Sequence, residues 1–143
     1  MSRIKIQLPQ IFPFSTSIPV RITDVNYGGH VGNDAVLSLI HEARMQFLKH
    51  FGFTEMSFGA AGMIMADVAI EFKNEAFYGD VLMANVAAVS TGRISFDIYY
   101  KFTKAKEGKE VIVAVAKTGM VCYDYDRKKI VAVSDDALKI FSI

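Results

Sequence analysis

The residue types best suited to chemistry are gathered in one stretch of ten residues, positions 24–33, with the sequence DVNYGGHVGN. The stretch combines an acid, two amides, a histidine and three glycines, and it lies immediately before a long helical pattern. Glycine lets a backbone turn sharply and approach a ligand closely. A helix N-terminus offers unpaired N–H groups and a partial positive charge. We therefore predict that a polarised oxygen atom binds at this stretch.

His30 is the best candidate for a general base in the stretch. A histidine side chain ordinarily has a pKa of about 6.5, which suits proton transfer near neutrality. The alternative is an ordinary loop histidine that bonds a backbone carbonyl to hold the turn. Asn26 can orient a water molecule or a substrate carbonyl, or it can form an Asx turn. Asp24 can orient His30, although capping of backbone N–H groups is the simpler role for it.

The N–H groups that open the helix, near Asn33, are candidate donors to an oxyanion. The alternative is that the side chain of Asn33 or Asp34 caps these groups, so that they do nothing more. Because glycines leave the approach to the helix open, we favour the functional interpretation. The residues expected to lie against a ligand there are Tyr27, Gly28, Gly29 and Gly32.

Length and composition predict one folded domain spanning residues 1–143. Hydrophobic residues make up 52% of the chain and charged residues 22%, which argues against disorder. The formal charge is +1, and no basic cluster is long enough to follow a phosphate backbone, so we expect no nucleic-acid binding. The N-terminus lacks a long apolar run and Cys122 is the only cysteine, so we expect a cytoplasmic protein that neither enters a membrane nor forms an internal disulfide.

The hydrophobic pattern predicts strands around one long helix. Strict alternation from residue 14 to residue 23 indicates a half-buried strand, and Pro19 within it favours an edge strand or a bulge. Apolar residues at three- and four-residue spacing predict a helix over residues 34–51. Four strand patterns follow at 63–73, 81–89, 93–104 and 111–123, and a short helix or turn at 135–141. Short loops join the four strands, so they are expected to be antiparallel in a two-layer α+β domain.

Other chemical groups carry weaker signals. Glu42 lies on the flank of the apolar stripe and can reach the loop of its own subunit or of a partner, or it can form a structural ion pair with Arg44 across a dimer. His41 and His50 have no second residue at metal-ligand spacing, so no metal site is predicted. Cys122 belongs to an apolar strand pattern, and the chain has no Gly-x-Ser-x-Gly elbow, so a serine or cysteine nucleophile is not expected.

Several of these features together resemble a known family. They are the Asp24-x-Asn26 pair, His30-Val31-x-Asn33, a following helix with Glu42-Ala43-Arg44, and a Gly79-Asp80 turn that opens a strand meander. This order resembles the hotdog-fold acyl-CoA thioesterases, in particular the 4-hydroxybenzoyl-CoA thioesterase-like branch. The loop is also similar to that of acyl-ACP thioesterases. The resemblance spans about residues 14–134.

The resemblance implies a hotdog fold, in which a curved antiparallel five-stranded sheet wraps around the long helix. It also implies hydrolysis of an acyl thioester, with an acyl-CoA favoured over an acyl-carrier-protein thioester as the substrate. Coenzyme A then enters as part of the substrate, and no other cofactor is expected. Active sites of the family lie between subunits, so a homodimer or homotetramer is expected. A contact with coenzyme A is implied for the turn residues Thr91, Arg93 and Ser95.

The sequence departs from the family at one position. The family loop usually has a second acid, which is the catalytic carboxylate in the best-understood branch, where this chain has Asn26. An amide neither accepts a proton nor attacks a carbonyl, so the catalytic role shifts to Asp24, His30 or Glu42. Two alternatives to hydrolysis remain: an acyl-thioester hydratase or dehydratase with Glu42 as the acid, and a non-catalytic acyl-CoA binding module.

Overall fold

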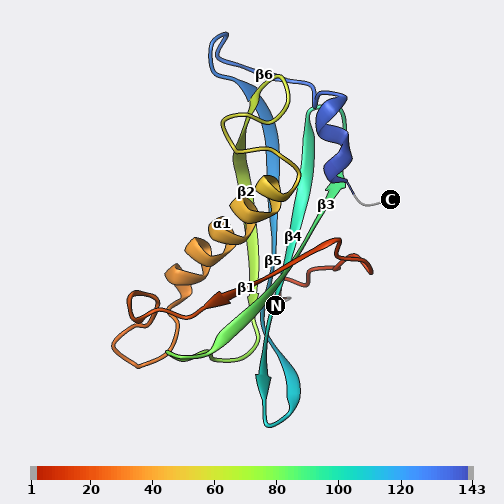
Figure 1. Ribbon diagram of the computed structural model, residues 1–143. Coiled ribbons are helices and arrows are strands. Elements are labelled where there is room, and N and C mark those ends of the chain that lie inside the picture. The colour runs from red at the N-terminus through yellow and green to blue at the C-terminus, as the bar shows by residue number, and fades with distance from the viewer. Residues whose placement is uncertain (1–2, 142–143) are drawn as a thin grey trace.

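The computed structural model describes residues 3–141, in which one long helix lies across one face of an antiparallel sheet (Figure 1). The order of elements along the chain is β1 (Phe14–Pro19), the 3₁₀ helix η1 (Ile22–Asp24), α1 (Asn33–His50), β2 (Gly62–Phe72), β3 (Val81–Ser90), β4 (Ser95–Lys106), β5 (Lys109–Asp124), β6 (Lys129–Val131) and the 3₁₀ helix η2 (Asp136–Ile140). This is the α+β arrangement predicted from the sequence.

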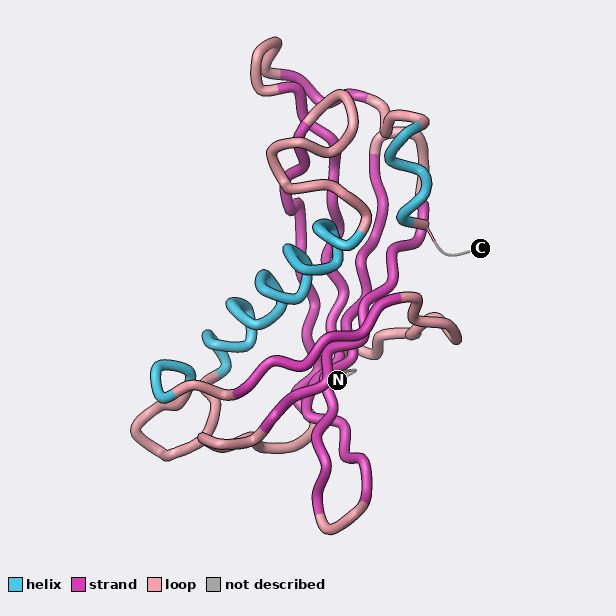
Figure 2. The backbone as a smooth tube through the Cα atoms, in the orientation of Figure 1, coloured by secondary structure: helices cyan, strands magenta, loops and turns pink. Residues whose placement is uncertain are grey.

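The strand order in the sheet is β1-β3-β4-β5-β2, and every neighbouring pair is antiparallel. A sixth short strand, β6, pairs with the end of β5. The strands twist and bend around the helix (Figure 2). β1 therefore lies at one edge, as Pro19 predicted, and the eleven-residue β2 lies at the other.

The first strand is shorter than expected. Alternation was expected to continue to residue 23, but β1 ends at Pro19 and the 3₁₀ helix η1 begins at Ile22. The side chain of Ile22 is 66% exposed, so it does not continue the buried face that Ile18 and Val20 form. Early termination of β1 leaves the chain free to turn into the loop that precedes the long helix.

The long helix lies within one residue of its predicted position. It begins at Asn33 and ends at His50, and Gly52 follows with φ of +86°, the left-handed conformation expected of a residue after a helix C-terminus. The apolar spacing placed Leu37, and not Leu39, in the stripe expected to be buried, but Leu37 is 43% exposed and Leu39 is buried instead. The buried helix residues are Val36, Leu39, Ile40, Ala43, Arg44, Phe47 and Leu48.

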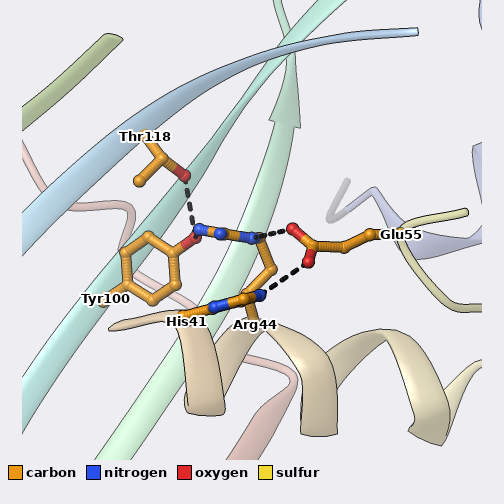
Figure 3. Close-up of polar contacts among 5 residues, drawn as sticks. All are labelled: His41, Arg44, Glu55, Tyr100 and Thr118. Atoms are coloured by element: carbon orange, nitrogen blue, oxygen red, sulfur yellow. Dashed lines mark hydrogen bonds and ion pairs between the residues drawn. The ribbon is translucent and has the colours of Figure 1, made fainter. Parts of the chain in front are cut away.

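Arg44 is a charged residue in this apolar face, and only 6% of it is exposed. Its Nε donates to Glu55 Oε2 at 2.8 Å and its Nη1 donates to the hydroxyl of Tyr100 at 3.2 Å (Figure 3). The Tyr100 hydroxyl lies 2.7 Å from that of Thr118, and His41 Nε2 lies 2.7 Å from Glu55 Oε1. Arg44 thus joins the middle of α1 to strands β4 and β5 and to the connection before β2.

The pKa values of this cluster follow from burial and pairing. Burial alone would raise the pKa of the Glu55 carboxyl, but the hydrogen bonds from Arg44 and His41 hold that pKa below its usual range. Burial raises the pKa of the Tyr100 phenol. The arginine, the carboxylate and the phenol are therefore, respectively, positive, negative and neutral at physiological pH.

We predict that Glu55→Gln lowers the free energy of unfolding at pH 7 by about 1.5–3 kcal/mol, the range for hydrogen bonds to charged groups. Because the pKa of Glu55 is lowered in the folded protein, its stabilisation is present above the pKa of an unfolded glutamate, about 4.3. It is lost as the pH falls through the folded value.

Urea denaturation between pH 3 and 7 measures this difference. The matched control is Glu42→Gln, which changes an exposed helix carboxylate that bonds Gln46. Surface contacts of this kind contribute less than about 1 kcal/mol. Equal losses in the two variants, or a Glu55→Gln loss that does not shrink on acidification, would contradict the assignment.

Candidate functional site

The loop before the helix folds back on itself through backbone hydrogen bonds. The Asn26 N–H donates to the carbonyl of His30 at 2.9 Å, and the Gly29 N–H donates to that of Asn26 at 3.0 Å. Gly29 has φ of +84°, which an L side chain rarely adopts. The Gly32 N–H donates to the carbonyl of Asp24 at 3.1 Å, so the two ends of the loop also meet.

This fold brings the side chains of Asn26 and His30 to the same place. A Cβ atom at Gly28 would lie 3.2 Å from Asn26 Oδ1 and 3.4 Å from His30 Nε2, so both atoms border the space that the missing side chain leaves. Asn26 Oδ1 accepts the Gly28 N–H at 2.9 Å, which is the Asx turn anticipated as one of its roles. The Asn26 Nδ2 group stays available as a donor toward a ligand.

The imidazole ring of His30 is oriented by its own backbone neighbour. Its Nδ1 lies 3.1 Å from the carbonyl oxygen of Val31, so the tautomer with hydrogen on Nδ1 donates there. In that tautomer Nε2 carries a lone pair that can accept a proton. The ring is thus held in the orientation that a general base requires, with Nε2 facing the Gly28 space.

The helix N-terminus at this site has no side-chain cap. The N-cap residue is Gly32, and neither Asn33 nor Asp34 caps the helix, contrary to the simpler expectation. The Val36 N–H bonds the Gly32 carbonyl at 3.3 Å, so the N–H groups of the preceding turn are the ones that can receive an acceptor. Asn26 Nδ2 would lie 3.8 Å from a Cβ atom at Gly32, which places the amide beside this helix start.

Asp24 lies close in sequence but does not contact His30. Only 4% of Asp24 is exposed, and its carboxylate accepts the backbone N–H of Arg21 at 2.8 Å and the Arg21 Nη2 at 3.2 Å. Its position corresponds to the simpler of the two roles considered, in which it holds the turn that leads into the loop.

Among the other predicted site residues, Glu42 and the turn at residues 91–95 lie apart from His30, whereas Tyr27 belongs to the same loop. Glu42 is exposed, and its carboxylate accepts Gln46 Nε2 at 2.7 Å. Tyr27 is fully exposed at the loop tip. The turn with Thr91, Arg93 and Ser95 lies at the far end of β3, and the hydroxyls of Thr91 and Ser95 are 3.0 Å apart. His30 instead lies at the near end of β3, through its bridge to Phe77.

A pocket of about 200 Å³ opens between the loop, the first turn of α1 and the end of β2. His30, Val31, Asn33 and Val36 line one side. The other side was not predicted and consists of Phe72, Lys73, Asn74, Glu75, Ala76, Val113 and Ala114. The polar Lys73-Asn74-Glu75 run after the β2 pattern was the available sequence signal, but nothing in it indicates which loop it faces.

The connection from β2 to β3 is attached to both sides of this pocket. The N–H groups of Lys73 and Asn74 donate to the carbonyl of Val113 at 2.9 and 3.2 Å, and Asn74 Nδ2 donates to that of Ile112 at 2.7 Å. On the loop side, the Val31 N–H donates to the carbonyl of Ala76 at 2.8 Å. The pocket wall and the His30 segment are therefore parts of one hydrogen-bonded unit.

Other chemistries find less support in the described residues. Burial raises the pKa of the Cys122 thiol to about 11, so it stays protonated and is a poor nucleophile. Within residues 3–141, no group of three His, Cys, Asp or Glu side chains is placed to hold a metal ion. None of the helices in that range is both long enough and apolar enough to cross a membrane.

Comparison with solved structures shows a shared fold. A 1,4-dihydroxy-2-naphthoyl-CoA thioesterase from Synechocystis superposes with a TM-score of 0.78 at 22% identity, covering 89% of this chain and 93% of that one. A 4-hydroxybenzoyl-CoA thioesterase mutant complexed with 4-hydroxybenzoyl-CoA gives 0.80 at 18% identity, covering 90% and 98%. The 4-hydroxybenzoyl-CoA thioesterase from a Pseudomonas species gives 0.77 at 18% identity, covering 89% and 97%.

The helix wrapped by the curved sheet is thus the hotdog fold implied by the sequence resemblance. A search of curated proteins finds no significant relative. A model of one protein family, however, matches residues 20–141, which include the loop, the helix and nearly all of the sheet. This chain belongs to the thioesterase-like superfamily.

Proposed function

We propose that this protein hydrolyses acyl-CoA thioesters to a free acid and coenzyme A. The observation that carries the proposal is that the Asn26 amide lies beside both His30 Nε2 and an uncapped helix N-terminus, while His30 and Asn33 line one pocket. Hydrolysis of a thioester needs a base for water and donors for the oxyanion, and these groups supply both. Membership of the thioesterase-like superfamily supports the same reaction.

In the proposed mechanism His30 Nε2 removes a proton from water as the water oxygen attacks the thioester carbonyl carbon. The negative charge that develops on the carbonyl oxygen is stabilised by the Asn33 N–H at the start of α1. The tetrahedral intermediate then collapses, the carbon–sulfur bond breaks, and the imidazolium returns its proton to the leaving thiolate. Asn26 Nδ2 orients the water or the carbonyl, because an amide has no basic function here.

For the substrate, we propose an acyl-CoA with an aromatic or similarly compact acyl group. The pocket is small and its apolar wall consists of Val36, Phe72, Ala76, Val113 and Ala114. The proteins compared above are named for 4-hydroxybenzoyl-CoA and 1,4-dihydroxy-2-naphthoyl-CoA. Coenzyme A enters as part of the substrate, and we propose that no further cofactor takes part and that the reaction is cytoplasmic.

A non-catalytic acyl-CoA binding module is the second candidate. It is favoured by Asn26, whose Oδ1 is already bound to the Gly28 N–H and cannot accept a proton from water. Hydration or dehydration of a thioester is less favoured, because the required acid, Glu42, is exposed and bonded to Gln46.

The first test is steady-state hydrolysis of a panel of aromatic and aliphatic acyl-CoAs. We expect turnover by the wild type and a loss of about a hundredfold or more in kcat for His30→Ala, the range for a general base. His50→Ala, a histidine at the other end of the helix, is the control. Activity unaffected by His30→Ala would refute the site assignment, and acyl-CoA binding without turnover would favour the binding module.

A second prediction concerns the space that Gly28 leaves open. Gly28→Ala places a methyl group 3.2 Å from Asn26 Oδ1 and 3.4 Å from His30 Nε2, between the two groups assigned to the water. We expect kcat to fall by about tenfold or more, since small misplacements of reacting groups are costly, while the protein stays folded at the assay temperature. Gly92→Ala, whose nearest neighbour is Ser95 Oγ at 3.7 Å, is the control. Full activity in Gly28→Ala would show that water does not bind there.

We further propose that two copies associate through their β2 strands. Within residues 3–141, β5 is the one strand that pairs with β2. The Met63 N–H near its start bonds the Glu55 carbonyl, and Glu71 Oε2 near its end accepts the Ile6 N–H, so the edge open to a partner lies between these residues. Apolar side chains along β2 are partly exposed, at 37% for Ile64, 43% for Met65, 37% for Val68 and 52% for Phe72. Because Phe72 also lines the pocket, a partner on this edge would border the active site.

Light scattering after size exclusion tests this association. We expect a mass of twice 15.9 kDa, or four times if dimers pair, and a shift to the monomer in Val68→Lys. Ile130→Lys, which alters an exposed apolar residue on β6, is the control and should keep the wild-type mass. A monomeric wild type at micromolar concentration, or an unaltered mass in Val68→Lys, would rule out the β2 interface.

A further inference from the structure

Lys104 on β4 is a half-buried residue outside the pocket, and only 9% of its side chain is exposed. Its Nζ donates to the carbonyl of Glu75 at 2.7 Å and to Asp80 Oδ2 at 3.0 Å. The ammonium also lies 5.0 Å from the centre of the Phe77 ring, at cation–π distance. Lysine is almost never buried unless it is paired, so this set of contacts is a specific one.

All three contacts of Lys104 are to one segment, the β2–β3 connection at residues 75–80. Within that segment Asp80 also accepts the Phe77 N–H at 2.8 Å, and its own N–H donates to the carbonyl of Phe77 at 3.0 Å. Lys104 therefore fixes a closed turn, with the ammonium bonded to its start and its end and the Phe77 ring beside it.

The same segment holds the proposed base. Phe77 forms an antiparallel β-bridge with His30, and the Ala76 carbonyl accepts the Val31 N–H at 2.8 Å. Glu75 and Ala76 also line the pocket. Phe77 thus contacts both groups: its ring lies beside the Lys104 ammonium, and its backbone pairs with that of His30.

The two halves of the connection are held by different means. Backbone carbonyls of β5 at Ile112 and Val113 bind its first residues, Lys73 and Asn74. Its second half receives the Val20 N–H at the Asp80 carbonyl and the three Lys104 contacts described above. Loss of Lys104 would leave the part that pairs with His30 attached mainly at its ends.

We propose that Lys104 is a positioning residue for the active site, holding the 75–80 turn so that the backbone of His30 and Val31 keeps the His30 ring oriented toward the Gly28 space. This inference rests on the proposed function in one respect, namely that His30 acts on the substrate. The dependence of the His30 ring orientation on Lys104 does not require that the protein hydrolyses a thioester.

The test compares Lys104→Met with Lys106→Met, which removes an exposed lysine two residues further along β4. In Lys104→Met we expect kcat to fall by about tenfold or more and KM to change less than kcat. The His30→Gln variant identifies which of the three histidines gives the His30 ring signals. In Lys104→Met the nitrogen-15 chemical shifts of that ring should move away from the values typical of an imidazole protonated on Nδ1. Lys106→Met should match the wild type in all three measurements.

Wild-type kcat and wild-type ring shifts in folded Lys104→Met would overturn the proposal. If Lys104→Met does not fold, Asp80→Asn removes only the charge that faces the lysine, and the same changes are expected at smaller size. If the wild type hydrolyses no thioester, the proposed function fails, and the ring shifts alone then decide whether Lys104 positions His30.

Discussion

The position of the long helix on the sheet depends on one buried cation. Burial opposes the charge of Arg44, but Tyr100 and Glu55 compensate, and the net effect raises the pKa of its guanidinium. A buried charge left without partners is far more costly than a lost apolar contact. The helix can therefore neither slide nor rotate on β4 without separating Arg44 from Tyr100. Eleven residues separate Arg44 from Asn33, about 16 Å of helix, so this register also fixes where the helix N-terminus meets the pocket.

Charge in the site is arranged differently from what an acid at position 26 would give. Asn26 contributes no charge, and the carboxylate of Asp24 is bound to Arg21. The charged side chains at the site are instead Lys73 and Glu75, which line the pocket, and Asp34, whose Oδ1 would lie 2.6 Å from a Cβ atom at Gly32. In the proposed mechanism His30 therefore takes its proton in a site that already contains side chains of both charges.

Much of this arrangement is visible in the sequence because it is local. The spacing of apolar residues located α1 to within one residue, and the glycines between Asn26 and His30 indicated a loop in which the two could meet. What could not be predicted depends on the strand order. Lys73, Asn74 and Glu75 face His30 only because the turn between β2 and β3 crosses from one part of the sheet to another. Within the chain Arg44 pairs with Glu55, which lies in a connection without regular structure, and no local spacing in the sequence indicated this partner.

The two edge strands of the sheet differ in length and in their exposed side chains, and this difference limits the kinds of assembly that copies of the chain can form. β1 is six residues long and contains serine and threonine at three successive positions. It ends in Pro19, which has no N–H to donate. β2 is eleven residues long and carries partly exposed apolar side chains. A fibre requires each copy to offer two adhesive edges, one for the copy before and one for the copy after. If two copies pair through their β2 edges, neither has a second such edge for a third copy. The asymmetry of the sheet therefore opposes open-ended polymerisation.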